Sequence, residues 1–131
     1  MQELQEKIKE INEILKNGEP NNWTKDHKNY SGYKPQFVID AVNSIMSGEW
    51  SLEVVSTHTY DSGRTNKSGN KIIEAFTHVR LKIGGSSIDA VASHPIIDDY
   101  GDAMKSAQTD AMKKAFAHFS IGNRAYHGLL K

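Results

Sequence analysis

The sequence predicts a single α+β domain, with helices packed on one face of a three-stranded antiparallel β-meander in the order α-α-β-β-β-α. Two periodicities indicate this fold class. Apolar residues return at steps of three and four in segments 2–16, 36–47 and 101–119, as in helices, and alternate with polar residues in segment 71–83, as in a half-buried strand. A length of 131 residues suits one domain with a core, so residues 1–131 are predicted to form one domain.

The composition indicates a globular protein without thiol chemistry. Apolar residues make up 37% of the chain and charged residues 24%, and no segment reaches the roughly 18 consecutive apolar residues of a membrane span. The N-terminus reads as a charged helix and not as a signal peptide. Because the chain contains no cysteine, disulfides, thiolate metal sites and cysteine nucleophiles are excluded. We therefore expect a cytoplasmic protein with no membrane partner.

The charge is balanced overall but unevenly distributed. The 16 Lys and Arg residues equal the 16 Asp and Glu residues in number, which is not typical of a protein that coats nucleic acid indiscriminately. Residues 63–82, however, contain five cations against Glu74 alone: Arg64, Lys67, Lys71, Arg80 and Lys82. This pattern is compatible with a basic stripe on a neutral protein.

The N-terminal segment 2–16 predicts a short amphipathic helix. Its apolar residues fall on one helical face: Leu4, Ile8, Ile11 and Leu15. Gly18 and Pro20 end the pattern. The apolar face is expected to pack either within its own domain or on a neighbouring subunit.

Segment 21–34 mixes rings and cations without any period, which predicts an aromatic and basic loop before the core of the domain at 35–125. Rings that stack on bases beside lysines that meet phosphates are typical of a single-strand surface. Trp23, Tyr33 and Lys34 are therefore candidate DNA-binding residues. The alternative is that the rings hold a long loop on the core while the lysines are solvated.

The central segments predict a helix and then the β-meander. Residues 36–47 form a helix that Gly48 ends, and Trp50 opens a strand that runs to about Tyr60. Residues 61–70 are rich in Ser, Gly and Asn and predict an exposed hairpin loop.

Segment 71–83 is the clearest strand. One face is expected to join the core: Ile73, Ala75, Thr77, Val79, Leu81 and Ile83. The other face is expected to form a basic and aromatic surface: Ile72, Glu74, Phe76, His78, Arg80 and Lys82. Gly84-Gly85 then predicts a two-residue hairpin turn that returns the chain as segment 86–94.

The last predicted helix, 101–119, has the most regular pattern in the chain. Its apolar arc contains Met104, Ala107, Ala111, Met112, Ala115, Phe116 and Phe119. At about 100° per residue, Lys113 lies almost opposite this arc, and Lys105 and Lys114 flank it.

The two ends of this helix also have recognisable signals. Asp98, Asp99 and Asp102 complement the positive end of the helix dipole, so this end is expected to cap itself and not to hold a phosphate. Gly122 is expected to end the helix in the left-handed conformation. His118 falls inside the apolar arc and is expected to be a hydrogen-bonded core residue.

Residue types used in catalysis are present without the spacing that catalysis needs. The six histidines show no metal-ligand spacing: His27, His58, His78, His94, His118 and His127. No nucleophile and base in a recognisable order, phosphate loop or dinucleotide fingerprint stands out. The sequence therefore predicts no enzyme, no metal site and no cofactor.

Three segments in a fixed order carry a family resemblance. Residues 101–116 read Gly-Asp-Ala-Met-Lys-Ser-Ala-Gln-Thr-Asp-Ala-Met-Lys-Lys-Ala-Phe, segment 36–50 joins a helix to a Gly-x-Trp exit, and Val79-Arg80-Leu81 lies in the clearest strand. Over residues 33–125 this order resembles the Rad-fifty-two superfamily of single-strand annealing proteins, which includes phage recombination proteins of the Sak type. In its signature helix a Thr-Asp pair precedes two basic residues, here Thr109, Asp110, Lys113 and Lys114.

The resemblance implies binding of single-stranded DNA and annealing of complementary strands in homologous recombination or double-strand-break repair, without ATP or another cofactor. It implies a recombination mediator in a bacterium or a phage-infected host cell. It also implies a homo-oligomer, with a ring as the expected form. A single-strand-binding protein, an exonuclease and a recombinase are candidate partners.

The resemblance also implies which residues contact DNA. Lys113 and Lys114 would line the inner wall of a groove and touch the DNA backbone, and the alternative is a solvated helix face on which Asp110 pairs with Lys114. The superfamily has a basic residue at the start of the second helix, where this chain has Gln36, so Lys34 is the candidate substitute. The further candidates are Lys105, Arg80, Lys82, Arg64, Lys67 and Arg124.

A double-stranded-RNA-binding-like module is the main alternative, since it also has a helix, three strands and a helix that carries two lysines near its start. Lys113 and Lys114 lie in the middle of the last helix, and an additional helix precedes the sheet. Both features favour the annealing protein. A purely structural or hydrolytic phage protein would show no salt-dependent affinity for nucleic acid.

Overall fold

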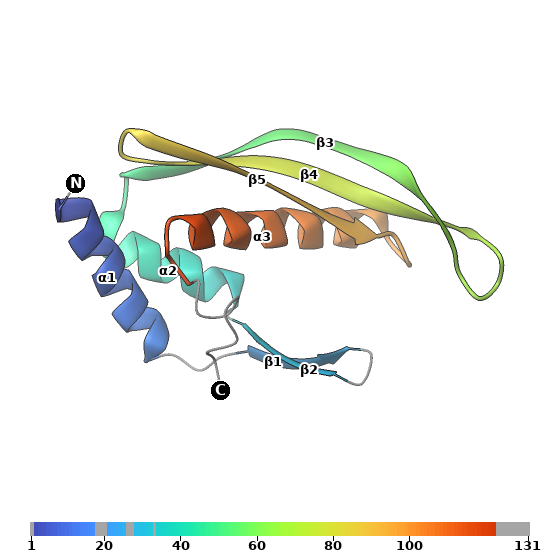
Figure 1. Cartoon of the computed structure of the whole chain (residues 1–131), viewed down its shortest axis with the longest axis horizontal. Coiled ribbons are helices and arrows are strands. Elements are labelled where there is room, and N and C mark those ends of the chain that lie inside the picture. The colour runs from blue at the N-terminus through green and yellow to red at the C-terminus, as the bar shows by residue number, and fades with distance from the viewer. Residues whose placement is uncertain (1, 18–20, 26–27, 33, 123–131) are drawn as a thin grey trace. The chain divides into compact units, whose positions relative to one another are not determined.

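The computed structural model describes residues 2–17, 21–25, 28–32 and 34–122. Within them, Figure 1 shows the following elements: α1 (Gln2–Lys16), β1 (Asn21–Lys25), β2 (Lys28–Gly32), α2 (Pro35–Met46), β3 (Trp50–Thr65), β4 (Lys71–Ile83), β5 (Ser86–Pro95) and α3 (Tyr100–His118). The three helices and the three-stranded sheet β3-β4-β5 confirm the predicted α+β class and the order α-α-β-β-β-α. In this described part of the chain, no helix is long and apolar enough to cross a membrane.

The chain forms two compact units, which we call the helical unit and the sheet unit. The helical unit comprises Met1–Trp50 and Phe116–Lys131, and the sheet unit comprises Ser51–Ala115. The sheet unit therefore holds β4, β5, nearly all of β3 and most of α3. The organisation of residues 1–131 as one domain stays a prediction.

In the sheet unit, β4 lies between β3 and β5. β4 and β5 run antiparallel, with Val79 opposite Ala90 and Arg80 opposite Asp89. The alternation predicted for β4 is confirmed, because its buried residues are Ala75, Thr77, Val79, Leu81 and Ile83. Gly84 takes a φ of 60° in the turn to β5, a conformation that side chains with a Cβ rarely adopt.

α3 lies along the face of the sheet that carries these buried residues (Figure 1). Ala103 and Met104 pack against Ala75 of β4. The helix begins as predicted, because the side chain of Asp99 accepts a hydrogen bond of 2.9 Å from the backbone N–H of Gly101. This bond satisfies one of the amide groups that every helix leaves unpaired at its start.

The end of α3 differs from the prediction. The N–H of Ile121 bonds to the carbonyl of Phe116 at 2.9 Å, which is the six-residue hydrogen bond of a Schellman motif. Ser120, with a φ of 66°, is therefore the left-handed capping residue that was predicted at Gly122, although Gly122 also has a positive φ of 70°. The prediction of a core His118 is wrong because the chain reverses just beyond it. His118 is exposed and Ile121 is buried.

In the helical unit, α1 packs against α2 of its own chain. Ile11 and Leu15 of α1 and Val42 of α2 are buried, so the apolar face predicted for α1 is used within the chain. The ammonium group of Lys7 lies 2.7 Å from a carboxylate oxygen of Glu49, which follows α2. This bond raises the pKa of Lys7 above its ordinary value.

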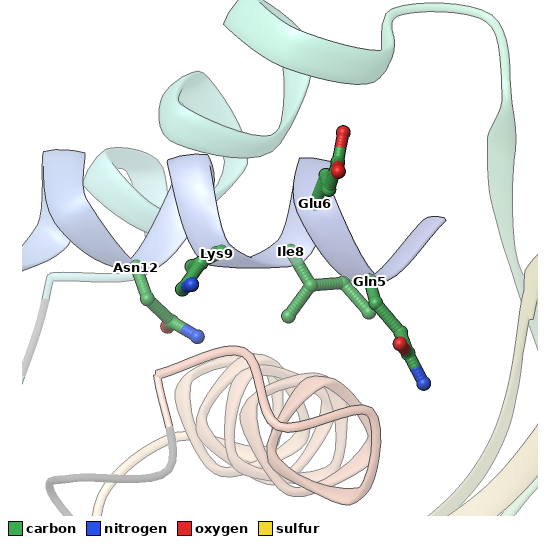
Figure 2. Close-up of a pocket in the computed structure, with 5 residues that line it drawn as sticks. All are labelled: Gln5, Glu6, Ile8, Lys9 and Asn12. Atoms are coloured by element: carbon green, nitrogen blue, oxygen red, sulfur yellow. The ribbon is translucent and has the colours of Figure 1, made fainter. Parts of the chain in front are cut away.

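A shallow pocket runs beside α1, and Figure 2 shows the residues that line it: Gln5, Glu6, Ile8, Lys9 and Asn12. The amide of Asn12 is already engaged, because Nδ2 donates to the carbonyl of Ser120 (2.6 Å) and Oδ1 accepts from the N–H of Gly122 (3.0 Å). Glu6 balances the charge of Lys9. The pocket therefore has no net charge that would attract a phosphate group.

Two segments predicted as loops contain strands. β1 and β2 lie within segment 21–34 and pair antiparallel, with Trp23 opposite Tyr30. β3 continues to Thr65, beyond the predicted end near Tyr60. Nearly all residues of β3 are exposed, so neither of its faces shows the apolar alternation by which a strand is recognised. Segment 21–34 likewise shows no regular alternation of apolar and polar residues, so its sequence carried no signal for β1 and β2.

Candidate nucleic-acid interface

Three cations lie on the surface of α3, and we call Lys105, Lys113 and Lys114 the α3 lysines. The buried residues of the helix form a broad arc: Ala103, Met104, Ala107, Ala111, Met112, Ala115 and Phe116. At about 100° per residue, Lys113 lies across from the middle of this arc, and Lys105 and Lys114 lie near its two margins. Lys105 and Lys114 are exposed, and Lys113 is half-buried. The positions predicted from the sequence thus match the helix.

None of the α3 lysines forms an ion pair with a carboxylate in the described part of the chain. The ammonium group of Lys114 instead donates a long hydrogen bond of 3.4 Å to the backbone carbonyl of Val91, in the outer strand β5. A carbonyl is a dipole without net charge. The positive charge of Lys114 therefore remains uncompensated at the edge of the sheet.

Asp110 holds α3 against β5. Its carboxylate lies 2.5 Å from Nε2 of His94, which projects from β5 toward the helix. The predicted alternative, in which Asp110 pairs with Lys114 one turn later, is not observed. The Asp of the Thr-Asp motif is therefore used to position the helix, which leaves Lys114 without an acidic partner among the residues that the structure describes.

Arg80 is compensated, in contrast to the α3 lysines. Its guanidinium group forms two hydrogen bonds with Asp89 on β5, at 2.8 and 3.0 Å, and Nε2 of His78 lies 2.9 Å from the same carboxylate. The bonds from Arg80, and secondly that from His78, lower the pKa of Asp89 from 3.8 to about 2. A phosphate would have to displace a bidentate ion pair to reach Arg80.

The remaining candidates near β3 and β4 fall into two groups. Arg64 lies 3.1 Å from the carboxylate of Glu74 and is compensated. Lys67, in the turn between β3 and β4, and Lys82, near the end of β4, are exposed. Neither has an acidic partner among the described residues.

Four predicted residues lie in segments that belong to the helical unit. Lys34 is exposed immediately before α2 and forms no side-chain cap there. Trp23 lies in β1. Tyr33 and Arg124 are outside the described residues. These four residues therefore stay candidates from the sequence alone.

An aromatic cluster lies on the face of β4 that was predicted to be basic and aromatic, but the part that β3 contributes to it was not predicted. The ring of His58 on β3 stacks on that of Phe76 on β4, with centroids 4.4 Å apart and an angle of 29° between planes. The ring of Tyr60 lies 6.3 Å from that of His58, and its hydroxyl lies 3.2 Å from Oγ of Ser93 on β5. The i, i+2 spacing of His58 and Tyr60 was the available signal. It becomes informative only when β3 is paired with β4.

A small α+β fold whose last helix carries uncompensated lysines has the features of a nucleic-acid-binding module. The family model of the Rad52/22 family double-strand break repair protein matches residues 2–128. The chain belongs to this family, which confirms the resemblance to the Rad-fifty-two superfamily and places the protein in DNA recombination and repair. A comparison with curated proteins found no match.

Proposed function

We propose that the protein binds single-stranded DNA and anneals complementary strands without ATP, and that it catalyses no reaction. The observation that carries this proposal is the set of three α3 lysines without carboxylate partners among the described residues, on a chain of a DNA repair family. Annealing requires cations that neutralise phosphates while the base edges stay free to pair. Lysines directed at the backbone do this without adding a sequence preference.

Lys113 and Lys114 contact the backbone of one strand in this proposal, and Lys105 extends the contact by about 12 Å along the helix axis. Lys67 and Lys82 are second-rank contacts because they are exposed and free of acidic partners in the described chain. Arg64 and Arg80 rank below them because each is ion-paired. Lys34, Trp23, Tyr33 and Arg124 stay candidates.

The proposal also covers the assembly of the protein into an oligomer and its cellular location. The outer strand β3 has one edge that is unpaired among the described strands, and such an edge is suited to cover by another copy. We propose that the protein forms a ring-shaped homo-oligomer and acts as a recombination mediator. Its setting is the cytoplasm of a bacterium or phage-infected host, and its partners are a single-strand-binding protein, an exonuclease or a recombinase.

The test is the rate at which two labelled complementary DNA strands pair, followed by fluorescence without nucleotide at low salt. We expect the wild type to accelerate pairing and the variant Lys113→Ala/Lys114→Ala to lose most of that effect. Lys9→Ala/Lys16→Ala on α1 is the matched control, since it removes the same charge from another helix. The oligomeric size and folding of both variants are measured alongside.

The outcomes separate the proposal from its alternatives. Equal loss in both lysine variants would assign the effect to net charge and not to α3. A wild type that leaves pairing unchanged at low salt, where phosphate contacts are strongest, would contradict annealing. Tight binding of duplex RNA in its place would indicate the double-stranded-RNA-binding-like module.

A further inference from the structure

The face of the sheet opposite α3, which we call the open face, exposes rings and apolar side chains. It is built from β3, β4 and β5 by the residues His58, Tyr60, Phe76, His78, Arg80, Lys82, Asp89, Val91 and Ser93. Val91 is 49% exposed and Tyr60 38% exposed. Large apolar groups that gather on the surface of a small fold mark a binding site more often than chance exposure does.

The rings of the open face are arranged to receive another flat group. Phe76 covers one side of the His58 ring, and His58 is exposed. The hydroxyl of Tyr60 is held by Ser93, which limits the motion of its ring. A ring that is held and still exposed can stack on a nucleobase at a small cost in side-chain entropy, and every base offers a suitable face.

Around the rings, the charges of the open face are paired with each other, and the unpaired Lys82 lies near the end of β4. Arg80 and His78 share the carboxylate of Asp89, and Arg64 is paired with Glu74. Phosphate binding is instead favoured at the edge of β5, where the uncompensated ammonium group of Lys114 lies 3.4 Å from the carbonyl of Val91.

The edge and the open face are adjacent. Val91 lies opposite His78, and Ser93 lies opposite Phe76, in the pairing of β5 with β4. The ring of Phe76 is thus about 5 Å, one strand spacing, inside the β5 edge. A strand whose backbone follows this edge can place its bases over the rings.

We propose that the open face binds the nucleobases of single-stranded DNA by stacking on His58, Tyr60 and Phe76, while the backbone follows the β5 edge beside Lys114. Stacking uses the flat side of a base and leaves its hydrogen-bonding edge free. A strand held in this way can still pair with its complement. The inference rests on the proposed binding of single-stranded DNA and assigns the bases a site separate from the cations.

The test compares the affinity of the full chain for two single strands of equal length and charge, oligo(dT) and an abasic strand that has the same backbone without bases. The variant is His58→Ala/Tyr60→Ala. Its control is Thr57→Ala/Thr59→Ala, which changes two exposed residues of the same strand whose side chains alternate onto the other face. Oligomeric size is measured for every protein.

We expect the wild type and the control to bind oligo(dT) about tenfold or more tightly than the abasic strand, as one or two stacked bases provide. The His58→Ala/Tyr60→Ala variant should lose this preference and keep its affinity for the abasic strand. Equal affinity of the wild type for both strands would overturn the base site and leave phosphate-driven annealing intact. A wild type that binds neither strand would overturn both proposals. A variant that keeps its base preference but changes in oligomeric size would show that the open face contacts another protein copy.

Discussion

The α3 surface and the open face of the sheet both carry cations, yet they differ in what those cations already contact. On the open face, Arg80 donates two hydrogen bonds to Asp89, and among the described cations of that face Lys82 alone is unpaired. On α3, Lys105 and Lys113 both have no acidic partner in the described chain. The number of cations is therefore a poor guide to a phosphate site. What matters is whether each cation is compensated within its own fold, because a compensated cation gains little from a phosphate.

The largest effect is expected from removing the hydrogen bond that joins α3 to β5. We expect Asp110→Ala to lower the free energy of unfolding by about 1 kcal/mol, because His94 loses its hydrogen-bond partner. Affinity for single-stranded DNA should fall as well, since the buried arc still holds the helix on the sheet but its contact with β5 near the α3 lysines is weakened. Urea unfolding and DNA titration measure the two effects. Ser106→Ala, at an exposed position of the same helix, is the control and should change neither.

A smaller effect is expected from a variant that leaves a cation of the open face without its acidic partner, as the α3 lysines are. Asp89→Asn removes the carboxylate that compensates Arg80, so this guanidinium becomes available to a phosphate. We expect tighter binding of single-stranded DNA at low salt, with a salt dependence steeper by about 0.7 in log K against log [salt], as one added phosphate contact gives. Unchanged binding would show that Arg80 lies away from the path of the strand, whatever its partner.

The lowered pKa of Asp89 predicts a small effect of acid on the free energy of unfolding. Because the folded-state pKa of Asp89 is lowered from 3.8 to about 2, its contribution to stability is present above about pH 4 and is lost as the pH falls toward 2. Asp89→Asn lacks this contribution at every pH. The difference between wild type and variant in free energy of unfolding should therefore shrink between pH 4 and pH 2 in urea titrations. A constant difference over this range would contradict the assignment.

The features that the sequence predicted well are those with a buried face. β4 alternates because one of its faces packs on α3, and the α3 lysines could be placed because the arc of Ala107 and Ala111 defines the helix orientation. β3 lacks such a face, so its full length was missed. The pairing of Arg80 with Asp89 depends on strand register, and the capping role of Ser120 depends on backbone geometry. Neither leaves a periodic signal.

The central claim is that the uncompensated lysines of α3 contact the DNA backbone and the ion-paired arginines of the sheet unit do not. The most direct test is the salt dependence of affinity for oligo(dT), measured for the wild type, Lys113→Ala/Lys114→Ala and Arg64→Gln/Arg80→Gln. Both variants remove two positive charges. We predict that the slope of log K against log [salt] becomes shallower by about 1.4 in the lysine variant and stays unchanged in the arginine variant. A shallower slope in the arginine variant with an unchanged slope in the lysine variant would contradict the claim.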